Sequence, residues 1–119
     1  MIEVCVLEDL LPERGVAALV GGDQVALFRL LGDRVVGVQQ RDPFSGANVM
    51  SRGIVGSRGD RTTLASPMYK QVFDLATGEC LDDLGSTPVD GLPATLRTWD
   101  VQVVGGAVLV GNPAGRRAA

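Results

Sequence analysis

Histidine is absent from this sequence of 119 residues. Its absence removes the usual general base, the Ser-His-Asp and Cys-His catalytic arrangements, and the imidazole ligand of many metal sites. The adjacent carboxylates of Asp82 and Asp83 do not replace it, because neighbouring acids in a loop usually mark a solvated turn and no distant acid can be assigned as their partner. Most hydrolase mechanisms are therefore excluded.

Basic residues and long apolar runs are also scarce. The chain has 11 lysine and arginine residues against 14 acidic ones, a formal net charge of −3 and no basic stripe, so we expect no nucleic-acid partner. The N-terminal stretch, MIEVCVLEDLLPERG, lacks the basic start of a secretory signal. No run approaches the roughly 18 apolar residues of a membrane span. We therefore expect a cytoplasmic protein without a membrane partner.

Cysteine is nearly absent as well, with only Cys5 and Cys80 in the chain. These two residues could pair in an oxidising compartment. In a cytoplasmic chain, however, two separated cysteines are more often reduced thiols in the core. We expect the thiols to be reduced and to serve packing, and we assign them no chemistry.

The chain does contain many short apolar runs separated by turns. Strands are expected at residues 15–20, 24–30, 34–40, 62–66, 71–75, 79–81, 96–104 and 107–111. Paired glycines at 21–22 and 105–106 suit tight hairpins. The 16 glycines, 6 prolines and regular strand spacing favour an all-β antiparallel sandwich or small barrel, with at most one short helical turn within residues 7–15.

The domain organisation follows from length and composition. With 45% hydrophobic and 21% charged residues, the chain is typical of one globular domain with a real core. We place this domain at residues 1–111 and expect a frayed, flexible tail at 112–119. Trp99 alternates with apolar neighbours and is expected to anchor the core or a sheet face.

Two segments have the composition of shaped loops. They read VQQRDPFSGANVMSRGIVG over residues 38–56 and ASPMYKQVFDLATGEC over residues 65–80. The glycines within residues 52–60 indicate a turn rather than a dinucleotide fingerprint, since that motif needs a strand before it and a helix N-terminus after it. The Arg-Gly-Asp at residues 58–60 is expected at a hairpin tip. Asp42 and Asp74 are expected to accept hydrogen bonds from loop amides.

Together the two loops resemble the cluster-binding loops of Rieske-type iron–sulfur domains. That pattern has Cys-x-His in the first loop and Cys-x-x-His in the second, followed by Phe-Asp-x-x-x-Gly, which Phe73, Asp74 and Gly78 match. When the loop prolines are aligned, the ligand positions are occupied by other residues: Asp42 and Phe44 in the first loop, Ser66 and Tyr69 in the second. Because a Rieske centre needs two thiolates and two imidazoles, the resemblance implies the fold without its cluster.

The closer resemblance is to the small subunit of assimilatory NAD(P)H-dependent nitrite reductase, a Rieske-like domain lacking the [2Fe-2S] ligands. It is carried by VALFR, DPFSGANVMSRGIVG and LASPMYKQVFDLATGECLDD, and extends from about Val4 to Val110. This resemblance implies an ISP-type β domain with a small two-loop subdomain, acting as a cytoplasmic accessory subunit without catalytic, cofactor-binding or metal-binding residues. It also implies a large partner subunit that carries FAD, sirohaem and a [4Fe–4S] cluster and reduces nitrite to ammonium.

The residues at the loop tips allow two roles. Phe44, Met68 and Tyr69 could form an apolar plug between the tips in place of the cluster, or could face outward as a docking patch rimmed by cations. We expect Phe44 and Tyr69 to point inward, and Met68, Lys70 and the arginines to point outward. The candidate docking residues are Arg41, Pro43, Phe44, Arg52, Pro67, Met68, Tyr69 and Lys70.

Two alternatives from other functional classes remain open at this stage. A Rieske-type ferredoxin that transfers electrons would require bound iron and visible absorbance. A stand-alone β-barrel binding module or hydrolase would show ligand affinity or activity without any partner.

Overall fold

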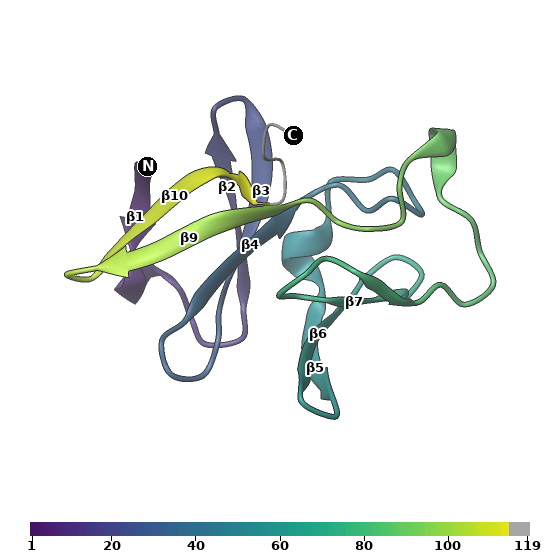
Figure 1. Cartoon of the computed structure of the whole chain (residues 1–119), viewed down its shortest axis with the longest axis horizontal. Coiled ribbons are helices and arrows are strands. Elements are labelled where there is room, and N and C mark those ends of the chain that lie inside the picture. Colours follow the sequence, from purple (N-terminus) through teal and green to yellow (C-terminus); the bar gives the residue numbers. More distant parts are fainter. Residues whose placement is uncertain (115–119) are drawn as a thin grey trace.

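The computed structural model describes residues 1–114, which form two antiparallel sheets (Figure 1). The larger sheet has the strand order β1-β10-β9-β4-β3-β2, and the smaller has the order β5-β6-β7-β8. The all-β antiparallel fold predicted from the sequence is confirmed. The strands are β1 (Ile2–Val6), β2 (Gly15–Val20), β3 (Asp23–Arg29), β4 (Val35–Gln39), β5 (Ile54–Arg58), β6 (Arg61–Ala65), β7 (Val72–Asp74), β8 (Cys80–Asp82), β9 (Thr98–Val104) and β10 (Ala107–Ala114).

Helical structure in the described residues is limited to three 3₁₀ turns, η1 (Leu7–Asp9), η2 (Met50–Arg52) and η3 (Val89–Gly91). The first matches the short turn expected within residues 7–15. A search of residues 1–114 finds no helix with the length and apolar character needed to cross a bilayer.

Glycine pairs form the expected hairpins. Gly21 and Gly22, both with positive φ, connect β2 to β3, and Gly105 and Gly106 do the same between β9 and β10. The Arg-Gly-Asp segment also lies at a hairpin tip as predicted, since Arg58 pairs with Arg61 across a two-residue turn that begins at Gly59. Because side chains rarely adopt positive φ, these turns fix the strand register.

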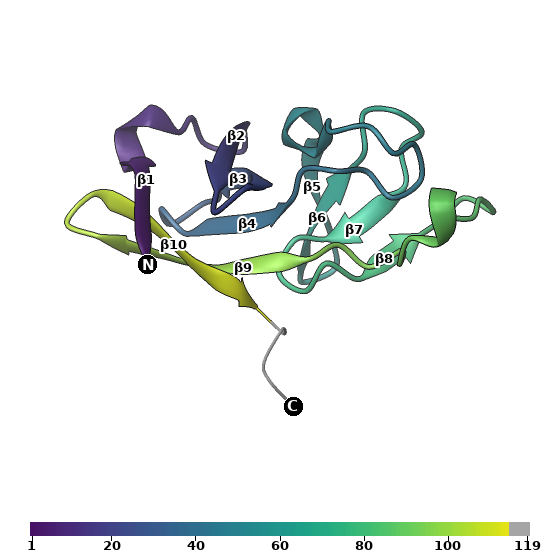
Figure 2. The same cartoon turned by 90° about the horizontal axis from the view of Figure 1, so that it is seen from above.

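In the sequence, the strands of the smaller sheet lie between β4 and β9, two strands that are neighbours in the larger sheet. β4 pairs directly with β9, in the register Gly37↔Trp99 and Val38↔Thr98, although β5 to β8 lie between them in the sequence. The two sheets therefore occupy opposite ends of the molecule (Figure 2). The connection from β4 to β5 carries the first predicted loop, and the tip of the second lies within the smaller sheet, between β6 and β7.

β3 is buried on both faces and joins two hydrophobic clusters. Val25 and Leu27 point into the first cluster, within the larger sheet, and Ala26 and Phe28 point into the second, against the smaller sheet. The members of the first cluster are Leu10, Val20, Val25, Leu27, Val35, Trp99, Val108 and Val110. Those of the second are Ala26, Phe28, Leu30, Val38, Phe44, Met50, Leu64, Phe73, Leu75 and Leu96. The core position predicted for Trp99 is confirmed.

The structure adds two strands that the sequence patterns did not indicate, β1 and β5. Residues 54–58 were expected to belong to a turn because glycines flank and interrupt them, but they form a regular strand. Gly53 is required there by a close approach rather than by a turn, because a Cβ at this position would lie 2.6 Å from the carbonyl oxygen of Ala65. Glycine is therefore needed at position 53, but because β5 packs closely against β6 and not because the chain turns there.

The expected start of the tail also changes. β10 continues to Ala114, so residues 112–114 belong to the larger sheet, and residues 115–119 lie outside the described part of the chain.

Both cysteines are free and half-buried, as the packing interpretation requires. Burial raises the pKa of the thiols of Cys5 and Cys80, so both remain protonated and weakly nucleophilic at neutral pH.

Candidate functional site

Asp42 and Ser66, which the proline alignment matches to the Rieske cysteines, meet across the two loops. Ser66 Oγ donates a hydrogen bond of 2.6 Å to Asp42 Oδ2, and both residues are almost fully buried, with 1% and 0% of their surface exposed. Each residue also shapes its own loop: Asp42 Oδ1 accepts from the Phe44 amide at 2.8 Å, and Ser66 Oγ accepts from the Met68 amide at 3.2 Å. The Asp42–Ser66 pair thus connects the loops where the sequence lost two ligands.

Phe44 fills the space beside this pair. Its ring is 5% exposed and lies 6.1 Å from the ring of Phe73, centroid to centroid, at a tilt of 48°. The preceding residue, Pro43, is buried too, and its carbonyl accepts a hydrogen bond from Val89 at 2.9 Å. The inward position predicted for Phe44 is confirmed, and a first-loop residue joins the second hydrophobic cluster.

The inward position predicted for Tyr69 is wrong, because its side chain is 57% exposed. The second loop is closed by hydrogen bonds from Lys70 N to the Ser66 carbonyl, at 3.1 Å, and from Ser66 N to the Gln71 carbonyl, at 2.9 Å. Lys70 has a φ of +67°, which turns the chain so that Gln71 is buried and the residues before it face outward. Phe44 and the Asp42–Ser66 pair already occupy the interior between the loops.

The other candidate docking residues divide by exposure. Pro43 and Phe44 are buried and cannot present a side chain to a partner, whereas Arg41, Arg52, Pro67, Met68, Tyr69 and Lys70 are exposed. Arg41 makes a 3.4 Å ion pair with Asp90. Sequence reasoning missed Ile54, which is 72% exposed and pairs with Ala65 beside the second loop. Nothing in the sequence pattern separates such an exposed isoleucine from a core one.

Asp74, Asp82 and Asp83 support turns, as expected. Asp74 Oδ1 accepts from the amides of Ala76 and Thr77, at 2.7 and 3.2 Å. Asp82 and Asp83 accept from the amides of Leu84 and Gly85, at 3.1 and 2.9 Å. These carboxylates therefore serve the local backbone.

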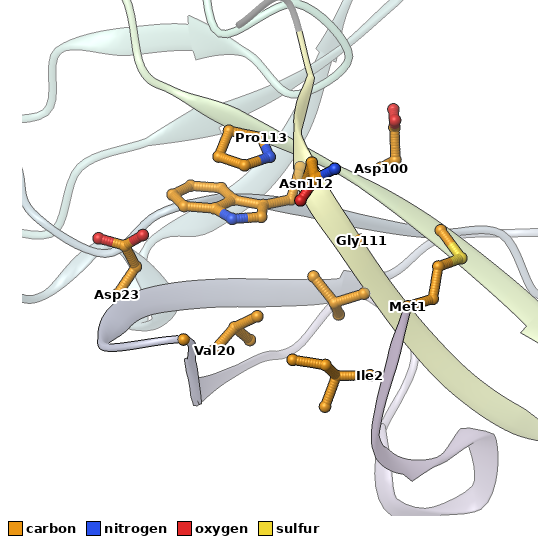
Figure 3. Close-up of a pocket in the computed structure, with 11 residues that line it drawn as sticks. Met1, Ile2, Val20, Asp23, Asp100, Gly111, Asn112 and Pro113 are labelled. Atoms are coloured by element: carbon orange, nitrogen blue, oxygen red, sulfur yellow. The ribbon is translucent and has the colours of Figure 1, made fainter.

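A hollow of about 420 Å³ lies at the other end of the molecule, beside the end of β10 (Figure 3). Ile2 and Val20 give it an apolar floor, and its two carboxylates, Asp23 and Asp100, lie on opposite sides (Figure 3). Because the two acids are separated and no nucleophile lines the hollow beside a base, the geometry supports no catalytic mechanism there.

Metal binding at the loops is not supported by the side chains present. Within residues 1–114, no group of three His, Cys, Asp or Glu side chains is placed to hold a metal ion. In the proline alignment, Phe44 and Tyr69 take the positions of the Rieske imidazoles, and Asp42 and Ser66, which take those of the thiolates, are hydrogen-bonded to each other. These residues do not fit a [2Fe–2S] cluster.

Comparisons with known proteins agree with this arrangement. The model of the Rieske-like [2Fe-2S] domain family matches residues 1–111. The NADH nitrite reductase small subunit of Escherichia coli K12 is 42% identical over 82 residues, which cover 68% of this chain and 76% of the relative. The NMR structure of the E. coli protein NirD superposes with a TM-score of 0.76 at 34% identity, covering 96% of both chains.

A third relative has a different organisation. The NAD(P)H nitrite reductase large subunit of Klebsiella oxytoca is 38% identical over 110 residues, which are 92% of this chain but 10% of that protein. The same kind of domain therefore occurs both as a separate small chain and within a large one. From the family match, the relatives and the loop geometry, the chain belongs to the Rieske-like family and, within it, to the nitrite reductase small subunits.

Proposed function

We propose that the chain is an accessory subunit of a cytoplasmic NAD(P)H-dependent nitrite reductase, the enzyme that reduces nitrite to ammonium. In this proposal it binds the large subunit and carries no reacting group of its own. The observation that carries the proposal is that none of the four aligned positions holds a cluster ligand: Asp42 and Ser66 hydrogen-bond to each other, Phe44 packs in the core, and Tyr69 faces solvent. FAD, sirohaem and the [4Fe–4S] cluster are accordingly assigned to the large subunit.

The relative from Klebsiella supports association with the large subunit. In that protein a similar domain is part of the large polypeptide itself. A domain that is covalently attached in one protein and separate in another is expected to bind non-covalently where it is separate. The Rieske ferredoxin alternative is disfavoured because electron transfer requires a cluster that the loop residues do not fit.

The surface proposed to bind the large subunit lies at the exposed loop tips. We define the tip surface as Arg41, Arg52, Ile54, Pro67, Met68, Tyr69 and Lys70, all of which are exposed. Tyrosine, methionine and arginine are enriched in the cores of protein interfaces. The backbone beneath is held by the Asp42–Ser66 pair and by the buried Phe44, so the tip surface is already ordered before binding.

Replacing Met68 and Tyr69 together with serine is expected to weaken the complex with the large subunit by about tenfold or more, because two apolar anchors are lost. The free energy of unfolding should change by less than about 1 kcal/mol, since both side chains are exposed. Isothermal titration calorimetry and urea unfolding measure the two quantities. Nitrite-dependent NAD(P)H oxidation by the large subunit, with and without each variant, shows whether turnover follows binding.

Leu31→Ser is the matched control, because Leu31 is 80% exposed in the turn between β3 and β4 and lies outside the tip surface. The control should bind like the wild-type chain. If the serine pair bound as tightly as Leu31→Ser, the assignment of the tip surface would be wrong.

A further inference from the structure

The edge of the smaller sheet borders a cleft next to the tip surface. β5 is an outermost strand of that sheet, and β6 is its one partner strand within residues 1–114. The cleft has a volume of about 480 Å³ and lies between residues 13–15, where β2 begins, and residues 51–55, where β5 begins. β2 is likewise an outermost strand, at one edge of the larger sheet, and its first residue, Gly15, lines the same cleft as the start of β5.

Close backbone contacts fix the geometry of this cleft. Gly15 lies so near η2 that a Cβ at this position would be 2.2 Å from the Ser51 carbonyl oxygen, and Gly53 is packed in the same way against Ala65. A side chain at position 15 would push the two walls apart, and one at position 53 would displace the start of β5 from β6. The cleft is therefore a built feature of the junction between the sheets.

The backbone of β5 offers unpaired hydrogen-bonding groups to this side. The two-residue turn makes Arg58 and Arg61 a hydrogen-bonded pair, and pairs alternate along an antiparallel ladder. It follows that the N–H and C=O groups of Val55 and Ser57 point away from β6. Exposed sheet edges are normally protected by lysine, proline, a bulge or a covering segment. Residues 54–57 contain no lysine or proline, and the β5–β6 register has no bulge.

The side chains around this edge indicate what would cover it. Ile54 is largely exposed at the start of β5, which provides an apolar anchor. Arg14 and Arg52 both line the cleft, and neither makes an ion pair among residues 1–114. Glu13 is the one acid in the lining, so the cleft has a net positive charge in a chain that is negative overall. An extended segment with acidic and apolar side chains is complementary to these features.

We propose that an extended, acidic segment of the large subunit adds to the free edge of β5 as a further antiparallel or parallel strand. This inference rests on the proposed function, because the large subunit supplies the segment. Arg52 and Ile54 belong to both the tip surface and this edge, so one partner can contact the two regions continuously. The added strand would satisfy the outward N–H and C=O groups of Val55 and Ser57, and its carboxylates would face Arg14 and Arg52.

Ser57→Pro tests the backbone part of the proposal. Proline removes the outward N–H of residue 57 while leaving the pairing of Gly56 and Arg58 with β6 available. Binding of the large subunit by the intact chain should weaken by about tenfold or more. The matched control, Ser57→Ala, keeps the N–H and should bind within about twofold of wild type. If Ser57→Pro and Ser57→Ala bound equally well, with circular dichroism showing both folded, the strand-addition proposal would be overturned.

Charge reversal and hydrogen exchange test the proposal without relying on proline. Arg14→Glu/Arg52→Glu should weaken binding by about tenfold and reduce its dependence on salt, whereas Arg34→Glu, outside the cleft, should not.

Amide hydrogen exchange at Val55 and Ser57 should slow on addition of the large subunit. Unchanged exchange at these amides in a formed complex would contradict the inference, even if the tip surface is correct.

A second copy of this chain is the competing occupant of the edge. If the isolated chain dimerised and its Val55 and Ser57 amides were already protected, the assignment of the edge to the large subunit would be wrong. If the wild-type chain failed to bind the large subunit at all, the proposed function itself would fail. If binding were lost only in the Met68 and Tyr69 variants and not in the β5 variants, the proposed function would stand and the present inference would not.

Discussion

Phe44→Ala is expected to lower the free energy of unfolding by about 3–5 kcal/mol, the range found for buried aromatic side chains replaced by alanine. The ring is almost completely buried and packs against Phe73 within the second hydrophobic cluster. Its removal leaves a cavity between the first loop and the smaller sheet. No metal cluster is present in this account to hold the loops, so the lost packing has no substitute. Equilibrium urea unfolding monitored by circular dichroism measures the effect.

Tyr69→Ala provides the contrasting control for this experiment. The loop alignment matches both aromatic residues to Rieske histidines, but Tyr69 faces solvent. Its replacement should change the free energy of unfolding by about 0.5 kcal/mol or less. If Phe44→Ala and Tyr69→Ala lowered the free energy of unfolding by similar amounts, the different roles assigned to Phe44 and Tyr69 would be incorrect.

Asp42→Ala is expected to lower the free energy of unfolding by about 2–6 kcal/mol, because it leaves two buried donors without an acceptor at about 1–3 kcal/mol each. These donors are the hydroxyl of Ser66 and the amide of Phe44. Both lie in the interior between the loops, where water cannot easily replace the carboxylate. The same urea unfolding experiment gives the value.

A double-mutant cycle with Ser66→Ala isolates the contact between the loops. The double variant should be less destabilised than the sum of the two single changes, because removing both partners leaves no unpaired hydroxyl. We expect a coupling free energy of about 1–3 kcal/mol, typical of residues that share a buried hydrogen bond. Simple additivity would mean that Asp42 and Ser66 do not act as a pair.

The strands that could be predicted from the sequence are those with unambiguous turns. Paired glycines at 21–22 and 105–106 marked two hairpins correctly, and the central strands carried apolar runs long enough to be recognised. β5 was missed because Gly53 and Gly56 are also common in turns. Whether a glycine marks a turn or a close backbone approach depends on a partner strand, here β6, which local patterns do not contain.

The sequence indicated which loop residues form the candidate site, but not which of their side chains point inward and which face solvent. The motif alignment correctly brought Asp42, Phe44 and Ser66 together from two separate loops. It failed for Tyr69, since both aromatic residues have the same type of sequence environment, close after a proline in a shaped loop. What separates them is the positive φ of Lys70 and the burial of Gln71, which are properties of the folded loop.

The β5 edge was beyond sequence reasoning for a different reason. Arg14 and Arg52 are far apart in the chain and become neighbours only because the start of β2 packs against η2. The exposure of Ile54 likewise depends on β5 being the last strand of its sheet. Features that depend on sheet order therefore required the structure.

The central claim is that the loops are held by protein contacts alone and that the chain in this state binds the large subunit. The most direct test is to dialyse the isolated chain against a chelator, measure its iron content, and titrate it into the large subunit. We expect the chain to contain no stoichiometric iron and to bind the large subunit with the same affinity before and after chelation. Loss of binding on chelation, restored by reconstituting an iron–sulfur cluster in this chain, would contradict it.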